Sequence, residues 1–232
     1  MSLMTAPSLE KPALDKSMIE KWLLDSRCNI IHYFDLPKDW WPITQGDNQS
    51  KATAWANDFF LRALDALYPK ESDLVIACNK GRVTRSEAAV FYAGYSNHSQ
   101  SQIMLDFVAV RWDDAMPIKL TAESEMNAAD SVGEPTTAKG YIWDFFKLLV
   151  VPCKYRLYMA RASGVEKMKQ VATCMRKLYQ RHRGNLFSET DQFGGVVIPG
   201  AEKQRNETLI LWTEGGVLQC EKISDFPLIC ED

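Results

Sequence analysis

Residues 116–126 read MPIKLTAESEM, and AKGYIWDFFKLLVV (138–151) and KYRLYMARA (154–162) follow them along the chain. The first segment follows a two-residue period and predicts a strand. The second has apolar side chains along one side and predicts a helix that ends before Pro152. The third predicts another strand. This order of strand, helix and strand predicts an α/β domain.

The segments on either side extend this pattern. Two strands are expected just upstream, SEAAVFYAGYS (86–96) and SQIMLDFVAVRWDD (101–114), and a polar turn between them suggests a hairpin. Before them, apolar residues at helical spacing predict a helix in KATAWANDFFLRALDALYPKE (51–71) that ends at Pro69. Downstream we expect a helix over 165–183 and strands in GGVVIPG (194–200) and ETLILWTE (207–214).

The N-terminal region differs in composition from the rest. Residues 5–14 predict a loose arm, 15–27 a short amphipathic helix, and 29–43 an irregular segment or a short strand on the core. We therefore expect residues 1–50 to be an arm and an aromatic-rich helical extension packed on a main domain over 51–232.

The composition is that of an ordinary globular protein, with 46% hydrophobic and 25% charged residues among 232. The net charge of −3 excludes a polycation, so binding to nucleic acid would need a local basic patch. The absence of a long apolar run and of a signal-like N-terminus predicts a cytoplasmic protein without membrane association. Six cysteines without a CxxC pair predict reduced, mostly buried thiols.

Acidic residues occur where the predicted strands should be buried. Glu123 and Glu125 share one face of their strand about 7 Å apart, where two charges repel by about 2.4 kcal/mol at an effective dielectric near 20. Asp106 interrupts an apolar run in the preceding strand. A register that brings Asp106 beside Glu123 would form one acidic cluster, offset by water, a base or a metal. The alternative for the two glutamates is a solvated strand end.

The helix over 138–151 carries Asp144 and Lys147 three residues apart and therefore on one face. If this helix packs over the strand ends, Lys147 reaches toward the acidic cluster. The alternative is an ordinary surface lysine or an ion pair with Asp144.

Together these elements resemble the restriction-endonuclease-like core of the PD-(D/E)XK superfamily. The resemblance spans residues 52–162 and is carried by AESEMN and YIWDFFKLLVVPCKYRLYM. It is strongest to members whose third-strand motif is Glu-x-Glu and whose following helix supplies the lysine. It implies a central mixed β-sheet flanked by α-helices. The first-helix acid of that family has two loose candidates here, Asp58 and Asp65.

The resemblance also implies a set of site residues. Asp106 corresponds to the motif aspartate and Glu123 to the motif acid. Glu125 stands where the usual lysine occurs, and Lys147 is the candidate for a migrated lysine. On this basis Asp106 and Glu123 would hold Mg²⁺, Glu125 would be a further ligand or a base, and Lys147 would orient the nucleophile or contact the phosphate. The implied function is magnesium-dependent hydrolysis of phosphodiester bonds in DNA.

A basic stripe lies downstream of this motif. Residues 154–183 contain nine lysines and arginines against Glu166 alone. Such a stripe is typical of a surface that tracks a nucleic-acid backbone, and the candidates are Lys154, Arg156, Arg161, Lys169 and Arg176. The alternative is a helix with one solvated basic face.

A second functional hypothesis is a non-catalytic binding protein that keeps the α/β core. Its tryptophan-rich N-terminal part would then dock a protein partner through Trp22, Trp40, Trp41 and Trp55. Tryptophans favour buried cores as well as interfaces, so their presence alone does not separate the two hypotheses.

Overall fold

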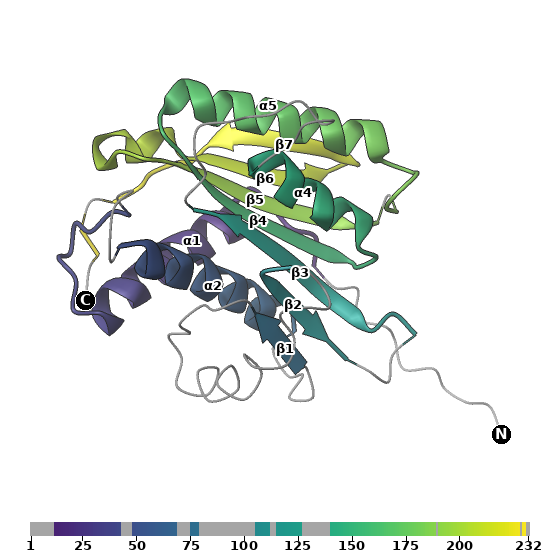
Figure 1. Ribbon diagram of the computed structural model, residues 1–232, viewed down its shortest axis with the longest axis horizontal. Coiled ribbons are helices and arrows are strands. Elements are labelled where there is room, and N and C mark those ends of the chain that lie inside the picture. The colour runs from purple at the N-terminus through teal and green to yellow at the C-terminus, as the bar shows by residue number, and fades with distance from the viewer. Residues whose placement is uncertain are drawn as a thin grey trace.

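A single mixed β-sheet with helices on both faces forms the body of the protein (Figure 1). This computed structural model describes residues 12–42, 48–68, 75–78, 105–111, 115–126, 140–188, 190–227 and 229–230. The predicted α/β class and the mixed sheet flanked by helices are confirmed.

The helices are α1 (Lys16–Tyr33), α2 (Asn48–Leu67), α4 (Tyr141–Val150) and α5 (Val165–His182), with a 3₁₀ helix η1 (Glu202–Glu207). The strands are β1 (Val75–Cys78), β2 (Phe107–Val110), β3 (Ile118–Glu125), β4 (Tyr155–Ala162), β5 (Gln192–Pro199), β6 (Leu209–Glu214) and β7 (Val217–Lys222). None of these helices is long and apolar enough to cross a membrane.

The seven strands lie in the sheet in chain order, β1 to β7. The β1–β2 and β2–β3 pairs are antiparallel, β3, β4 and β5 are parallel, and the β5–β6 and β6–β7 pairs are antiparallel. Parallel neighbours need a crossover connection, and α4 and α5 provide it after β3 and β4. Because both crossovers advance in the same direction, both helices cover the same face of the sheet.

Two hydrophobic cores lie on the two faces of the sheet. The alternation of side chains along β4 sends Leu157 and Met159 toward α1 and α2, while Tyr158 and Ala160 point toward α4 and α5. Every residue of β4 is buried, as expected for a central parallel strand covered on both faces.

The predicted ends of helices and strands are most accurate for long segments whose apolar residues repeat at a regular spacing. The helices predicted over 138–151 and 165–183 and the strand over 154–162 are confirmed. The predicted helix over 15–27 continues to Tyr33, so the expectation of an irregular segment from residue 29 is wrong at its start. The chain also contains two strands that were not predicted, β1 and β7. The strand predicted over 86–96 lies outside the described residues.

The tryptophans of the N-terminal region belong to the core between α1, α2 and the sheet. Trp22, Trp40, Trp41 and Trp55 are each at most 7% exposed. The ring centres of Trp41 and Trp55 lie 5.7 Å apart in an edge-to-face arrangement. These side chains therefore stabilise the packing of the extension and present little surface to a partner.

A disulfide joins Cys28 on α1 to Cys230 near the C-terminus, with the two Cα atoms 5.5 Å apart. The prediction that all cysteines are reduced is therefore wrong. Arg27 lies beside this bridge, fully buried, and donates hydrogen bonds to the carbonyl oxygen of Trp40 from Nε and Nη2. Burial, together with the charge of the nearby Arg205, lowers the pKa of the Arg27 guanidinium to about 10.

Removal of this bridge is expected to destabilise the fold, because it closes a loop of 202 residues in the unfolded chain. Cys28→Ser should lower the free energy of unfolding by about 2–5 kcal/mol, measured by urea denaturation under non-reducing conditions. Cys174→Ser, at a half-buried cysteine outside the disulfide, is the matched control. Equal stability of the two variants would contradict a stabilising role for the bridge.

Candidate functional site

Asp106 lies immediately before β2 and not inside a strand as predicted. The β2–β3 register pairs Phe107 with Ala122, which brings Asp106 to the neighbourhood of Glu123. Asp106 Oδ2 accepts hydrogen bonds from the backbone N and from Oγ of Ser124, both at 2.9 Å. The predicted proximity of Asp106 to the acidic strand is therefore present, and Ser124 fixes its carboxylate there.

Glu123 is almost fully buried under α4, with 1% of its surface exposed. Lys147 Nζ lies 2.7 Å from Glu123 Oε1 and 2.8 Å from Asp144 Oδ1. Lys147 therefore forms an ion pair with Asp144 and also contacts the acidic cluster. From the sequence alone, these two contacts were alternatives. The burial excludes a solvated strand end as the explanation for Glu123.

The electrostatics of this cluster are dominated by burial. Burial and the charge of Asp106 raise the pKa of the Glu123 carboxyl to about 8, although Lys147 acts in the opposite direction. The pKa of Lys147 is also raised, because its hydrogen bonds to Asp144 and Glu123 more than offset the effect of burial. At neutral pH the cluster therefore holds a charged lysine beside a carboxyl that readily takes up a proton.

Glu125 follows two residues later and is half-buried. Its charge, with that of Asp144, acts on the buried Tyr158 beneath α4, whose pKa is raised well above its ordinary value mainly by burial. Glu125 thus lies on the same α4-facing side of β3 as Glu123, but its side chain is more exposed to solvent. Asp106, Glu123 and Glu125 all lie where β2 begins and β3 ends.

The candidate ligands of a divalent cation are the carboxylates of Asp106 and Glu123. No group of three or more His, Cys, Asp or Glu side chains within the described ranges is placed to hold a metal. Magnesium, however, is commonly held by one or two carboxylates together with water and substrate phosphates. Asp106 and Glu123 are the residue types of that smaller donor set, and Lys147 Nζ lies 2.7 Å from Glu123 Oε1.

The two candidates for a first-helix acid lie on α2, across the sheet from Glu123. Asp58 is buried there and accepts hydrogen bonds from Arg62 Nε at 2.8 Å and from Asn29 Nδ2 at 3.0 Å. Asp65 is exposed. The structure does not bring either residue into the cluster on the α4 face.

Two of the candidate nucleic-acid contacts are buried. Arg156 is 2% exposed and donates to the carbonyl oxygens of Leu148, Val151 and Cys153 as well as to Asp191. Arg161 is 4% exposed and donates to the carbonyl oxygen of Pro42 at 3.1 Å. The assignment of these two arginines to nucleic-acid binding is corrected, because their guanidinium groups bond to the protein interior.

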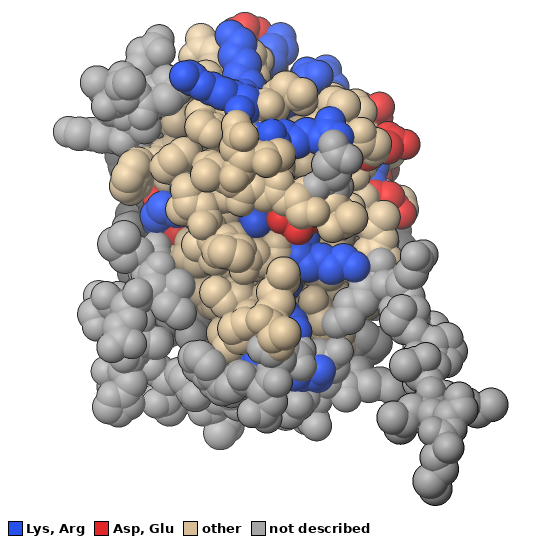
Figure 2. Space-filling view, turned by 90° about the vertical axis from the view of Figure 1, so that its right-hand side faces the viewer, with Lys and Arg blue, Asp and Glu red and all other residues tan. Residues whose placement is uncertain are grey.

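The other three basic candidates lie nearer the surface. Lys154 is half-buried, with its ammonium 5.5 Å from the ring centre of Tyr155. Lys169 and Arg176 are exposed on α5, where Lys169 pairs with Glu166 at 2.8 Å. Figure 2 shows lysine and arginine side chains gathered at the top of the molecule, where α5 lies in Figure 1. The exposed basic surface therefore follows α5.

The structural role of Arg156 predicts a large effect on stability. Arg156→Ala should lower the free energy of unfolding by about 3 kcal/mol or more, because it leaves the carbonyl oxygens of Leu148 and Val151 without their side-chain donor and removes the ion pair with Asp191. Lys169→Ala, at an exposed pair, should change it by less than about 1 kcal/mol. Thermal and chemical denaturation of both variants checks this, and similar stabilities would contradict the assignment.

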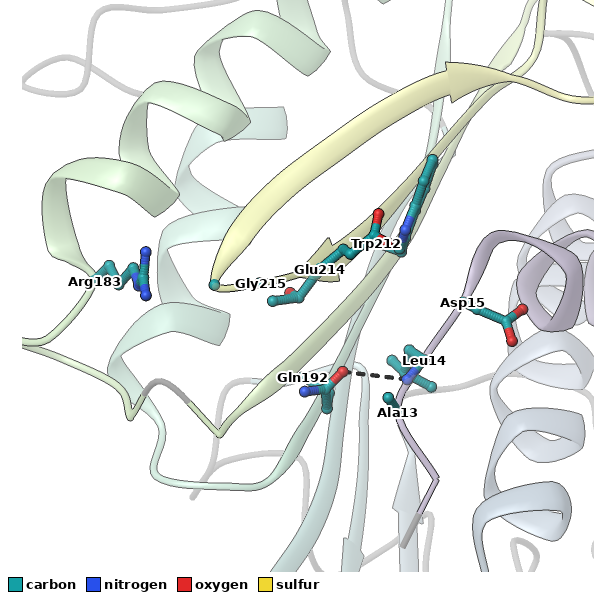
Figure 3. Close-up of a pocket in the computed structure, with 10 residues that line it drawn as sticks. Ala13, Leu14, Asp15, Arg183, Gln192, Trp212, Glu214 and Gly215 are labelled. Carbon is teal, nitrogen blue, oxygen red and sulfur yellow. Dashed lines mark hydrogen bonds between the residues drawn. The ribbon is translucent and has the colours of Figure 1, made fainter.

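A separate pocket of about 410 Å³ lies at the opposite end of the parallel strands, near the start of β5 (Figure 3). Leu14 donates its backbone N–H to Gln192 Oε1 across one side of it at 3.2 Å. On the other side the Arg183 guanidinium packs against Gly216 so closely that a Cβ there would clash with it. Gly216 also has a positive φ of 73°. Both facts require glycine in the β6–β7 turn.

The sequence pattern found the acidic residues and missed what surrounds them. Ser124 was not singled out, although it lies between the two glutamates and donates two hydrogen bonds to the aspartate. The pocket at the start of β5 was missed as well, because its lining comes from segments far apart in the chain.

The raised pKa of Glu123 predicts how stability depends on pH. The folded state holds a proton on this carboxyl between its ordinary value of 4.5 and about 8. The free energy of unfolding should therefore fall as the pH rises through that window. Glu123→Gln should reduce the fall by roughly 1–3 kcal/mol between about pH 5 and pH 8.5.

Urea denaturation across that range measures the effect. Glu214→Gln, at an exposed glutamate, is the control and should keep the wild-type slope. A Glu123→Gln curve parallel to that of the wild type would show that Glu123 ionises normally.

Comparison of the chain with protein-family models, with curated proteins and with solved structures finds no match in any of the three. Function must therefore be inferred from the chemistry of the site and from the order of the elements around it.

Proposed function

We propose that this protein is a magnesium-dependent nuclease with a restriction-endonuclease-like core that hydrolyses phosphodiester bonds in DNA. The carrying observation is the contact of Lys147 on α4 with the buried Glu123 of β3, beside Asp106 at the start of β2. The proposed metal-dependent hydrolysis of a phosphodiester uses a lysine beside two carboxylates that come from adjacent strands.

The order of the elements supports the same proposal. Helix α2 is followed by the antiparallel strands β1, β2 and β3, then by α4 and by β4, which is parallel to β3. This is the order of helix, three-strand meander, helix and fourth strand on which the resemblance rests. In this arrangement Asp106 and Glu123 come from neighbouring strands and Lys147 from the helix that follows them.

Each side chain of the cluster has a role in the proposed reaction. Asp106 and Glu123 would hold the ion, and Ser124 keeps the Asp106 carboxylate oriented through two hydrogen bonds. Bound magnesium would supply an activated water and neutralise the charge that develops on the phosphate. The Lys147 ammonium, positioned by Asp144, orients the nucleophile or contacts the phosphate. Glu125 is a further ligand or a base.

The position of Lys147 bears on the main departure from the family pattern. Glu125 occupies the place of the usual lysine, so the cation must come from elsewhere. Lys147 Nζ lies 2.7 Å from the motif acid Glu123. This distance supports the interpretation of Lys147 as the migrated lysine.

The test is cleavage of plasmid DNA and of a panel of labelled oligonucleotides in the presence of Mg²⁺ or Mn²⁺. Wild-type protein should cut at least one substrate, and Asp106→Ala and Glu123→Ala should reduce the rate by more than about a hundredfold, since each removes a ligand. Lys147→Ala should also reduce it. Glu214→Ala, at an exposed acid far from the cluster, should cut like the wild type.

The second candidate is a non-catalytic subunit that keeps the fold. The observation that favours it is the Lys147 ammonium already in contact with Glu123, which occupies one oxygen of that carboxyl without a metal. Under this alternative, neither metal should alter the melting temperature or the DNA in any variant. That outcome would contradict the nuclease proposal.

A further inference from the structure

A row of three aromatic rings crosses from α4 to α5 on the outside of the molecule. The ring of Trp143 stacks on that of Phe146, with centres 6.1 Å apart and planes inclined by 27°. Phe146 in turn contacts the ring of His182 on α5, edge to face at 5.7 Å. We call these three residues the aromatic row.

Trp143 is unusual for its exposure. It is 49% exposed, whereas every other tryptophan in the described part of the chain is at most 8% exposed. Tryptophan side chains bury large apolar areas when they serve only the core. An exposed indole held by stacking on a neighbouring ring therefore presents a flat apolar face to solvent.

The aromatic row borders the acidic cluster. Trp143 lies four residues before Lys147 on α4, so the two side chains lie on neighbouring turns of one helix face. Phe146 directly precedes Lys147. A ligand stacked on Trp143 would therefore lie within one helical turn of the ammonium that contacts Glu123.

Basic side chains continue from the other end of the row. Arg181 precedes His182 in α5, and Lys177 lies one turn earlier on the same side of that helix. Both are exposed. They add to the exposed basic surface of α5.

We propose that the aromatic row is a stacking platform for unpaired bases of a single-stranded nucleic acid whose phosphates are held by Lys177 and Arg181. Aromatic faces next to cationic side chains are the features that bind single strands without regard to sequence. Unpaired bases are required, because the bases of a duplex already stack on one another. The positive surface beside the row complements the phosphates and selects a nucleic acid over an uncharged apolar partner.

This inference rests on the proposed nuclease function and names its substrate class. A strand lying across the row would bring a phosphodiester to Lys147 beside the two carboxylates. The substrate would then be single-stranded DNA or a locally unpaired part of a duplex.

The test is binding of a fluorescein-labelled oligothymidylate of about 20 nucleotides to the full chain in EDTA, followed by fluorescence anisotropy. Wild-type protein should bind this strand more tightly than a duplex of equal length. Trp143→Ala should weaken the binding about tenfold, in line with the loss of one stacked base. Tyr33→Ala is the matched control, because Tyr33 is 54% exposed and also contacts a neighbouring ring, that of Phe34, but lies at the end of α1.

Charge is tested in the same assay. Lys177→Ala and Arg181→Ala should each lower the dependence of the logarithm of affinity on the logarithm of salt concentration by about 0.7, the value for one contact to a single strand. Glu214→Ala should retain binding, since it removes no aromatic ring and no cationic side chain from the platform.

Undiminished binding by Trp143→Ala, or a loss as large in Tyr33→Ala, would overturn the platform. Equal affinity for the duplex and the single strand would overturn it as well. Because the assay contains no metal, its result is independent of cleavage. Tight binding that requires Trp143 in a protein that cuts nothing would reject the nuclease and keep the platform.

Discussion

The burial of the Glu123 carboxylate under α4 is the constraint on which the candidate site depends. A carboxyl group taken out of water keeps its proton to higher pH, and its ionised form is costly unless a cationic partner compensates it. Lys147 provides that partner only if α4 packs over β3 in one orientation, with Asp144 holding the ammonium from the other side. The acid therefore fixes how the helix lies on the sheet, and the helix in turn determines which cation faces the acid.

A second buried cation secures the same helix from its other end. The last carbonyl groups of a helix have no partner within it, and Arg156 donates to those of Leu148 and Val151 from the neighbouring strand. Its interaction with the C-terminal end of α4 is favourable for a positive charge. Arg156 thus anchors the helix that carries Lys147, although it contributes nothing to the surface. On the opposite face, the disulfide joins α1 to the segment at Cys230, and Arg27 beside it bonds to the Trp40 carbonyl oxygen.

The sequence predicted those features that repeat at short range. The long apolar periods of α4, α5 and β4 could be recognised because each segment has enough residues to show its period. The acids at 106 and 123 were found because charge is rare inside an apolar run. The bridge between Cys28 and Cys230 could not be predicted, since no spacing indicates a partner 202 residues away. The burial of Arg156 was missed because a count of basic residues does not say which ones bond to carbonyl groups.

The central claim is that Asp106 and Glu123 together form a cation site beside Lys147. A crystal structure of the protein soaked in Mn²⁺, with anomalous difference maps recorded at the manganese absorption edge, tests it most directly. The account predicts an anomalous peak within about 2.5 Å of an oxygen of each carboxylate, with water completing the coordination. A map without a peak at this position, with Lys147 still bonded to Glu123, would contradict it and leave the cluster as an ion pair that fixes α4 on the sheet.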